Sequence, residues 1–191
     1  MAENSLEYSR RLYERVIDWY KNADSKAQIT LTLNGIFVAF LTTSIFKNPT
    51  EVNGIIHKFS ALTWIFLFLM GVCLVGSIVC ALLCLWSRIA FHAERDERLL
   101  NAIDKMNETG EYSPDVMLFF KTIAMLDGEK FLEQLAKTDE QFEIKALGSQ
   151  IYLLSKRVYV KHRLVNYSFA LVGGALIFFL LGAVSYLFNL K

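Results

Sequence analysis

Charged residues are absent from three long stretches of this 191-residue chain. No Asp, Glu, Lys or Arg occurs in residues 27–46, 61–86 or 164–190. Proton relays and substrate paths through a membrane generally use ionisable side chains inside the spanning segments. If these stretches cross a membrane, the missing charges argue against a transporter or a proton-conducting protein.

Cysteine and histidine are also scarce, which leaves little room for metal or disulfide chemistry. The three cysteines, Cys73, Cys80 and Cys84, all lie in the second uncharged stretch, with no His or carboxylate among them. We therefore expect packing roles for them and no metal. The sequence has no nucleophile elbow, phosphate loop or convincing pair of carboxylates, so it predicts neither an enzyme nor a cofactor. A net charge of +1 gives no bulk attraction to nucleic acid.

Apolar residues, by contrast, are abundant, at 54% of the chain. A helix of about 20 residues reaches about 30 Å, the thickness of the hydrocarbon core of a bilayer. The uncharged stretches are at least this long, so they predict transmembrane helices over residues 27–46, 61–86 and 164–190. Residues of mixed charge precede the first helix and no cleavage site follows it, so we expect it to remain in the mature protein.

Lysine and arginine are distributed unevenly among the segments that flank these helices. Residues 1–26 hold five of the twenty and residues 87–163 hold twelve, whereas residues 47–60 hold two and the C-terminus one. Lys and Arg accumulate on the cytoplasmic side of membrane proteins. The pattern therefore predicts a cytoplasmic N-terminus, an external loop at 47–60, a cytoplasmic segment at 87–163 and an external C-terminus.

Both cytoplasmic segments are expected to be helical. Residues 1–26 predict an amphipathic helix. The second span is expected to continue as a helix to Met106, with a turn at 107–115, a short helix over 115–126 and a long helix from Glu129 into the third span. No stretch alternates like a strand. The predicted fold class is an all-α membrane protein, with three transmembrane helices and a helical cytoplasmic domain between the second and third.

One face of the first span is small and polar. Its members recur at intervals of four and three residues: Gln28, Thr32, Gly35, Ala39 and Thr42. Such faces mediate contacts between membrane helices, either within one protomer or between copies in a homo-oligomer. Asn34 borders this face, and because an unpaired amide in hydrocarbon is costly, we expect it to have a partner.

Asp24 and Lys26 stand where the charged N-terminal segment meets the first span. In one interpretation, Asp24 is the N-cap of the membrane helix and Lys26 extends its ammonium to the headgroups of membrane lipids. In the other, Ala-Asp-Ser-Lys-Ala at residues 23–27 is a gating joint between the cytoplasmic helix and the span. We favour the cap, because caps and extended lysines are common at membrane borders.

Two segments of the chain resemble a known family. One is Ala-Asp-Ser-Lys-Ala entering a span that contains Asn34-Gly35. The other is LFFKTIAMLDGEKFLEQL at residues 118–135, followed by QIYLLSKRVYVKHRLVNYSFALVGG at residues 150–174, which leads into the last span. In this order they resemble the transmembrane effectors of Pycsar antiphage systems over most of the chain.

The resemblance implies a defence function. A neighbouring nucleotide cyclase, triggered by phage, would make cyclic UMP or cyclic CMP, and the effector would sense it. The effector would then impair the bacterial inner membrane, so that growth ends before phage are released, an abortive infection. An alternative of a different class is a membrane scaffold or pore-forming anchor that a partner protein triggers.

A cyclic mononucleotide carries a phosphate and a flat base, so it needs cations and aromatic or apolar walls. We expect these groups just inside the membrane, below the second and third spans. The candidate ligand-binding residues are Arg88, His92, Arg95, Tyr152, Arg157, Tyr159 and Lys161. Basic residues at this level are also expected from contacts with lipid headgroups alone, so both interpretations stay open.

Overall fold

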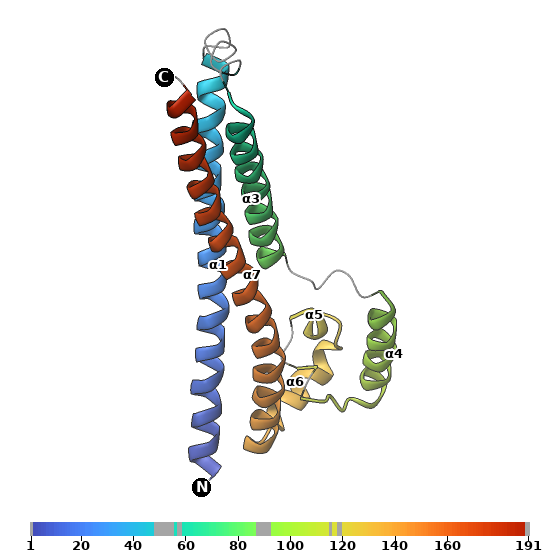
Figure 1. Cartoon of the computed structure of the whole chain (residues 1–191). Helices are drawn as coiled ribbons and strands as arrows, with labels where there is room; N and C mark the ends of the chain where they lie inside the picture. The colour runs from blue at the N-terminus through green and yellow to red at the C-terminus, as the bar shows by residue number, and fades with distance from the viewer. Residues whose placement is uncertain are drawn as a thin grey trace. The chain divides into compact units, whose positions relative to one another are not determined.

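The computed structural model describes residues 2–47, 56, 59–86, 93–114, 116–117 and 120–189. Within these ranges the regular structure is helical, without a strand, which confirms the all-α prediction (Figure 1). The helices are α1 (Ala2–Lys47), α3 (Ala61–Leu85), α4 (Ala93–Thr109), α5 (Phe120–Ile123), α6 (Gly128–Ala136) and α7 (Glu140–Asn189). The chain forms two compact units: unit 1 is Met1–Lys21 with Ser87–Tyr159, and unit 2 is Asn22–Trp86 with Val160–Lys191.

α1 and α7 each belong to both units without a break. α1 has 46 residues and α7 has 50. The predicted cap at Asp24 is therefore wrong, because Asp24 lies in the middle of a helix rather than at its unsatisfied N-terminus. The predicted helix start near Glu129 is confirmed, because α6 begins at Gly128. The predicted unbroken run of that helix into the last span is wrong, since residues 137–139 separate α6 from α7. The predicted continuation of the last helix into the third uncharged stretch is confirmed.

α3 ends where the sequence predicted a continuous helix. Its last residue is Leu85, and Trp86 adopts an extended backbone with φ −64° and ψ 116°. α4 is a separate helix that begins at Ala93. The prediction of one helix from the second span to Met106 is therefore wrong.

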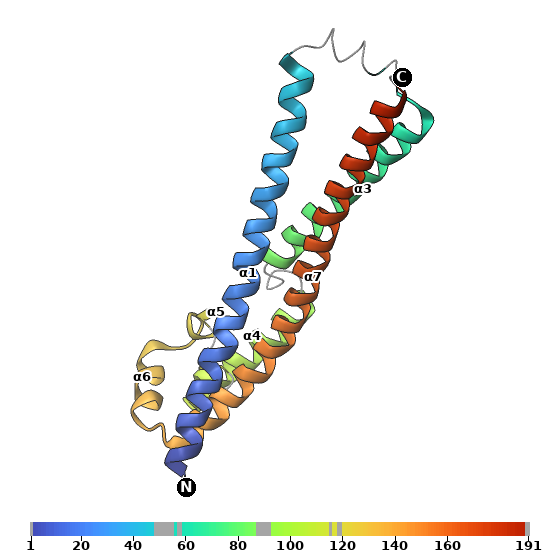
Figure 2. The ribbon, with the colours of Figure 1, turned by 60° about the vertical axis from the view of Figure 1, so that its left-hand side comes forward.

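Unit 2 is a bundle of α3 with the second halves of α1 and α7 (Figure 2). Its core includes Leu74 and Ala175, and Phe37 packs edge-to-face on Phe179 with ring centroids 5.5 Å apart. Small residues let α3 approach α7: a Cβ on Gly76 would lie only 3.2 Å from a leucine methyl of α7. The bundle therefore packs closely through side chains of all three helices.

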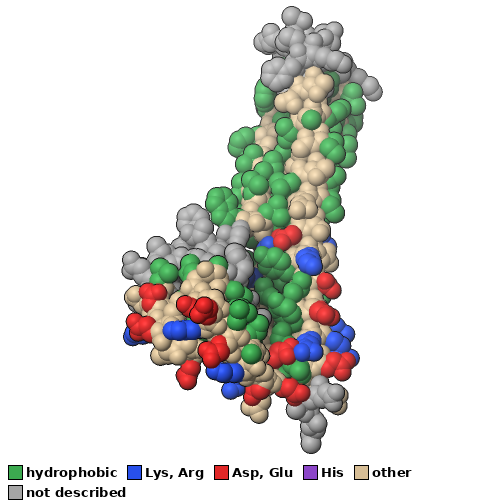
Figure 3. Space-filling model, turned by 180° about the vertical axis from the view of Figure 1, so that it is seen from behind, with side chains coloured by type: hydrophobic (Ala, Val, Ile, Leu, Met, Phe, Trp, Pro, Cys, Tyr) green, Lys and Arg blue, Asp and Glu red, His purple; other side chains and the backbone are tan. Residues whose placement is uncertain are grey.

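Apolar side chains also cover the outside of unit 2. On the face seen in Figure 3, hydrophobic side chains lie along unit 2, and Lys, Arg, Asp and Glu gather on unit 1. Among the described residues, two helices, Ala61–Leu85 and Glu140–Asn189, are long and apolar enough to cross a membrane. An exposed apolar surface of this extent is typical of a protein region that meets lipid or another protein.

Unit 1 is held together by a small core and by a side-chain clamp at the end of α4. The core includes Val16, Ile103 and Leu147. The amide group of Asn107 donates to the carbonyl of Met125 at 3.1 Å. Its oxygen accepts from Tyr112 Oη at 2.9 Å and from the N–H of Asp127 at 3.0 Å. The sequence predicted a short helix over residues 115–126. Among the residues described in that segment, the helix is α5, which is shorter than predicted.

Candidate functional site

A partly buried ion pair joins α1 to α7 inside unit 2. The Lys161 ammonium donates to the Asp24 carboxylate. The Lys161 side chain is 11% exposed and that of Asp24 is 28% exposed. Removing one member of a buried pair leaves the other charge desolvated and costs up to about 3–5 kcal/mol. The packing of α1 on α7 is therefore sensitive to the loss of either side chain.

The end of α3 packs against this ion pair. Cys84 is fully buried, and its thiol lies 3.6 Å from the backbone carbonyl oxygen of Lys161 and 3.9 Å from a carbonyl oxygen of α1, as a weak donor. Cys84 also shares a core cluster with Ala27 of α1 and Val165 of α7. Asp24, Cys84 and Lys161 thus form one layer in which three helices meet, called the junction layer below.

A second polar layer lies deeper in the bundle. Asn34 is 2% exposed, and its amide donates to Ser77 Oγ at 2.8 Å. Ser77 Oγ contacts the carbonyl of Ser168 at 3.0 Å, and Ser168 Oγ donates to the carbonyl of Ser77 at 2.8 Å. The prediction that Asn34 has a partner is confirmed. Because each of the three helices contributes one side chain, this layer fixes their rotation and height relative to one another.

A third polar contact lies near the N-terminus of α3. The hydroxyls of Thr63 and Ser185 are both buried and lie 3.0 Å apart, and Ser60, the N-cap of α3, lies 3.0 Å from Thr63. In the part of the chain that the structure describes, no buried side-chain nitrogen or oxygen lacks a hydrogen-bond partner. The buried polar side chains of unit 2 are thus satisfied within the unit.

The small and polar face predicted on the first span does not take part in this packing. All of its members are exposed in the single chain: Gln28, Thr32, Gly35, Ala39 and Thr42. A Cβ added to Gly35 would have no heavy atom within 4 Å. α1 instead buries Ala27, Thr30 and Asn34. For this face, contact within one protomer is therefore wrong, and contact between copies stays a prediction.

The predicted ligand-binding residues near the second span lie outside the described part of the chain, wholly or in their side chains. Arg88 and His92 lie outside the described residues, and Arg95 lies on α4 with a side chain that is also outside them. Lys161 is buried and engaged by Asp24, so its predicted place in an open cationic pocket is wrong. The sequence pattern missed this because the two partners stand 137 residues apart.

On the first half of α7, the two predicted tyrosines lie on one face, whereas Arg157 lies about 140° around the helix from Tyr152. Tyr152, Arg157 and Tyr159 are all exposed. Lys156, which the sequence analysis did not single out, lies over the Tyr152 ring with its ammonium 4.2 Å from the ring centre. Residues four apart are neighbours on a helix, so the Tyr152–Lys156 contact could have been predicted from the sequence alone.

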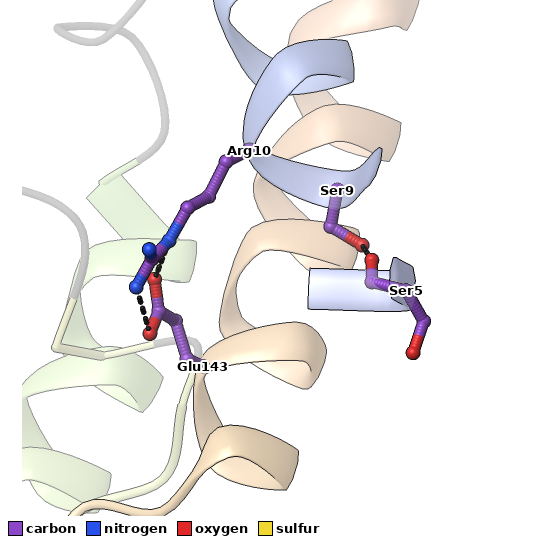
Figure 4. Close-up of polar contacts among 4 residues, drawn as sticks. All are labelled: Ser5, Ser9, Arg10 and Glu143. Atoms are coloured by element: carbon purple, nitrogen blue, oxygen red, sulfur yellow. Dashed lines mark hydrogen bonds and ion pairs between the residues drawn. The ribbon is translucent and has the colours of Figure 1, made fainter. Parts of the chain in front are cut away.

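A second ion pair joins α1 to α7 in unit 1 (Figure 4). The Arg10 guanidinium donates to both carboxylate oxygens of Glu143, from Nε to Oε1 at 2.7 Å and from Nη2 to Oε2 at 2.8 Å. The hydrogen bond from Arg10 holds the pKa of Glu143 below its usual value. Directly before Arg10 on α1, Ser9 Oγ donates to the carbonyl of Ser5, one turn earlier in the same helix, at 2.9 Å.

Comparison with known proteins gives one match. A family model described as PycTM, the Pycsar effector protein domain, matches residues 8–188. The match confirms the resemblance drawn from residues 23–27 and 118–135 and extends over both units. No curated protein and no solved structure matches the chain.

Replacing Asn34 should loosen the bundle of unit 2. Asn34→Ala removes the amide that joins α1 to Ser77, and should lower the free energy of unfolding by about 1–2 kcal/mol. The measurement is unfolding in mixed detergent micelles. Thr43→Ala is the matched control, because the exposed Thr43 hydroxyl donates only to Ala39 O of its own helix. Equal losses in the two variants would contradict the assigned role of Asn34.

The Arg10–Glu143 pair should make the stability of unit 1 depend on pH. The folded-state pKa of Glu143 lies below the ordinary value of 4.5, so the pair stabilises the folded state above that pH, and the contribution disappears as pH falls through the lowered pKa. Thermal melts of wild type and Glu143→Gln should therefore differ near neutral pH and converge in acid. Arg10→Gln should remove the same pH-dependent increment; if that increment survives, the assigned cause is wrong.

Proposed function

The chain belongs to the Pycsar effector family, and on that premise we propose that it is an antiphage membrane effector that senses a cyclic pyrimidine mononucleotide and then impairs the bacterial inner membrane. The family match over residues 8–188 is the observation that carries the proposal. A partner nucleotide cyclase supplies cyclic UMP or cyclic CMP, and membrane damage ends growth before phage are released. In this proposal the effector acts by binding the nucleotide and damaging the membrane, without a catalytic step.

The packing of unit 2 supports three membrane spans. Trp64 and Trp86, 51% and 57% exposed, stand at the two ends of α3. About 33 Å of helix separates them, which suits the two interfaces of a bilayer. Residues 27–46 of α1 pack on the other two helices through Asn34 and Phe37. We therefore assign residues 27–46, the first span of the sequence, as a membrane-spanning helix in addition to α3 and the second half of α7.

The distribution of Lys and Arg supports the orientation. Residues 1–26 and 87–163 hold seventeen of the twenty and are assigned to the cytoplasm. Residues 47–60 and the C-terminus are then external. This orientation exposes unit 1 to a nucleotide made inside the cell.

Unit 1 is the proposed sensing unit. Tyr152 and Tyr159 offer exposed rings on one face of α7 on which a pyrimidine can stack. Arg157, exposed farther around the helix, is proposed to contact the cyclic phosphate. Arg88, His92 and Arg95 are proposed to complete the cationic surface. Lys161 is left out, because Asp24 engages it.

The exposed face of α1 is the proposed contact between copies. Its small residues permit close approach of two helices, and the Gln28 amide can bond across them. The flanking Ile36 and Phe40 are apolar and exposed, as expected of side chains that meet lipid. Within residues 24–35, the outer face is therefore proposed to contact other copies, and the inner face that carries Asn34 packs within the bundle.

Nucleotide should open the membrane in a reconstituted system. Liposomes that contain the protein and a self-quenched dye should leak with cyclic UMP or cyclic CMP, and not with cyclic AMP or cyclic GMP. Arg157→Glu should raise the nucleotide concentration needed by at least about tenfold, the equivalent of one charged hydrogen bond. Lys145→Glu is the matched control, an exposed Lys on the same helix.

Absence of leakage with either pyrimidine nucleotide, for protein that is folded and inserted, would overturn the proposal. Leakage that instead appears when a partner protein is added would favour the scaffold or pore-forming anchor.

Bulk added to the outer face of α1 should separate the copies. Gly35→Leu should lower energy transfer between differently labelled protomers in liposomes severalfold and weaken leakage in parallel. The fold of one chain should persist, because a side chain at Gly35 enters open space. Ala183→Leu adds three carbons at an exposed position of α7, on a different helix from this face, and should change neither readout. Unchanged energy transfer in Gly35→Leu would exclude this face as the contact.

A further inference from the structure

Every covalent connection between the two units passes beside the junction layer. The boundary between the units falls three residues before Asp24 on α1 and two residues before Lys161 on α7. After α3, it falls three residues beyond Cys84. A conformational change in unit 1 that travels along the chain therefore enters unit 2 within a turn of one of these three side chains.

The ion pair is the part of this layer that can exist in two states. Closed, the Lys161 ammonium is buried against the Asp24 carboxylate. Separated, each charge needs water in place of its partner, and Asp24 already lies partly exposed. A ligand can shift a protein from one state to another only if some element has two discrete arrangements, and the closed and separated ion pair would be such an element.

The neighbours of the pair tie its state to the position of α1. Ala23 and Ala27 of α1 are fully buried on either side of Asp24, and the Cys84 thiol lies against backbone carbonyls of both α1 and α7. If Asp24 moves away from Lys161, these contacts break together. Ten residues along the same helix, Asn34 bonds to Ser77, so a displaced α1 also disturbs the second polar layer.

We propose that the Asp24–Lys161 pair is a latch that holds α1 against α3 and α7 in the resting protein, and that its opening starts the damage to the membrane. The membrane damage is that of the proposed function, on which the inference rests. The proposed latch does not depend on which ligand opens it. It supplies a reason for a charged pair at the border of three otherwise apolar helices.

The first test measures dye leakage from liposomes without any nucleotide. Asp24→Asn and Lys161→Met should each raise basal leakage at least tenfold over wild type. The double variant D24N/K161M should leak no more than the single variants, because a latch opens once. The exchanged pair D24K/K161D should return leakage to within two- to threefold of wild type.

The Arg10–Glu143 pair provides the matched control. It joins the same two helices, but in unit 1, and both of its side chains are more than a third exposed. Arg10→Gln should leave basal leakage at the wild-type level. Equal basal leakage in Arg10→Gln and Asp24→Asn would show that any α1–α7 ion pair has this effect, and would overturn the latch.

If a single variant fails to insert because one charge has lost its partner, a crosslink can test whether separation at this site causes leakage. D24C/K161C has no orphaned charge at this site, and should leak until a cleavable bifunctional thiol reagent joins the two cysteines. Leakage should stop on crosslinking and resume on cleavage, whereas wild type treated in the same way should not change. Folded single variants that leak like wild type, or a crosslinked protein that still leaks, would overturn the latch.

The outcomes also separate the latch from the proposed trigger. If wild type ignores cyclic UMP and cyclic CMP while Asp24→Asn leaks without them, the nucleotide assignment fails and the latch stands. If the nucleotides open wild type while the Asp24 and Lys161 variants behave like it, the latch fails and the proposed function stands.

Discussion

In hydrocarbon, a polar side chain that lacks a protein partner has no water to replace it. Unit 2 is arranged around this constraint. The amide of Asn34, the hydroxyls of Ser77 and Ser168, and the Thr63–Ser185 contact are all paired within the bundle. Leucine and phenylalanine packing would tolerate many rotations of three helices, but paired polar groups tolerate few. Close packing and the paired polar groups hold the helices together, and the polar layers select one arrangement.

The same constraint explains what could be predicted from the sequence. Long uncharged stretches indicate helices because only internally bonded backbone survives in lipid, and one amide among apolar residues demands a partner. The identity of that partner was not predictable, because it depends on the relative height of three helices. The hydroxyl residues inside the other two stretches, Ser77 and Ser168 among them, are candidate partners for Asn34, but the sequence does not say which one bonds it.

The errors arose where local pattern and tertiary structure disagree. Asp24 before an apolar stretch has the local pattern of an N-cap, yet α1 begins 22 residues earlier, at Ala2. Lys161 has the pattern of a lysine at lipid headgroups, yet it is buried against a residue on another helix. α3 ends at Leu85 although no Pro or Gly follows for many residues. For Lys161 the deciding contact is distant in sequence, and only the folded chain reveals it.

α1 and α7 contain neither of the two prolines of the chain, and each is a single helix of more than forty residues. An uninterrupted ladder of backbone hydrogen bonds resists torsion, so that turning one end about the helix axis turns the other end with it. Successive side chains stand about 100° apart around that axis. A modest twist of α1 is therefore enough to change which of its side chains face α3 and α7 and which face outward, with no hinge anywhere along its length.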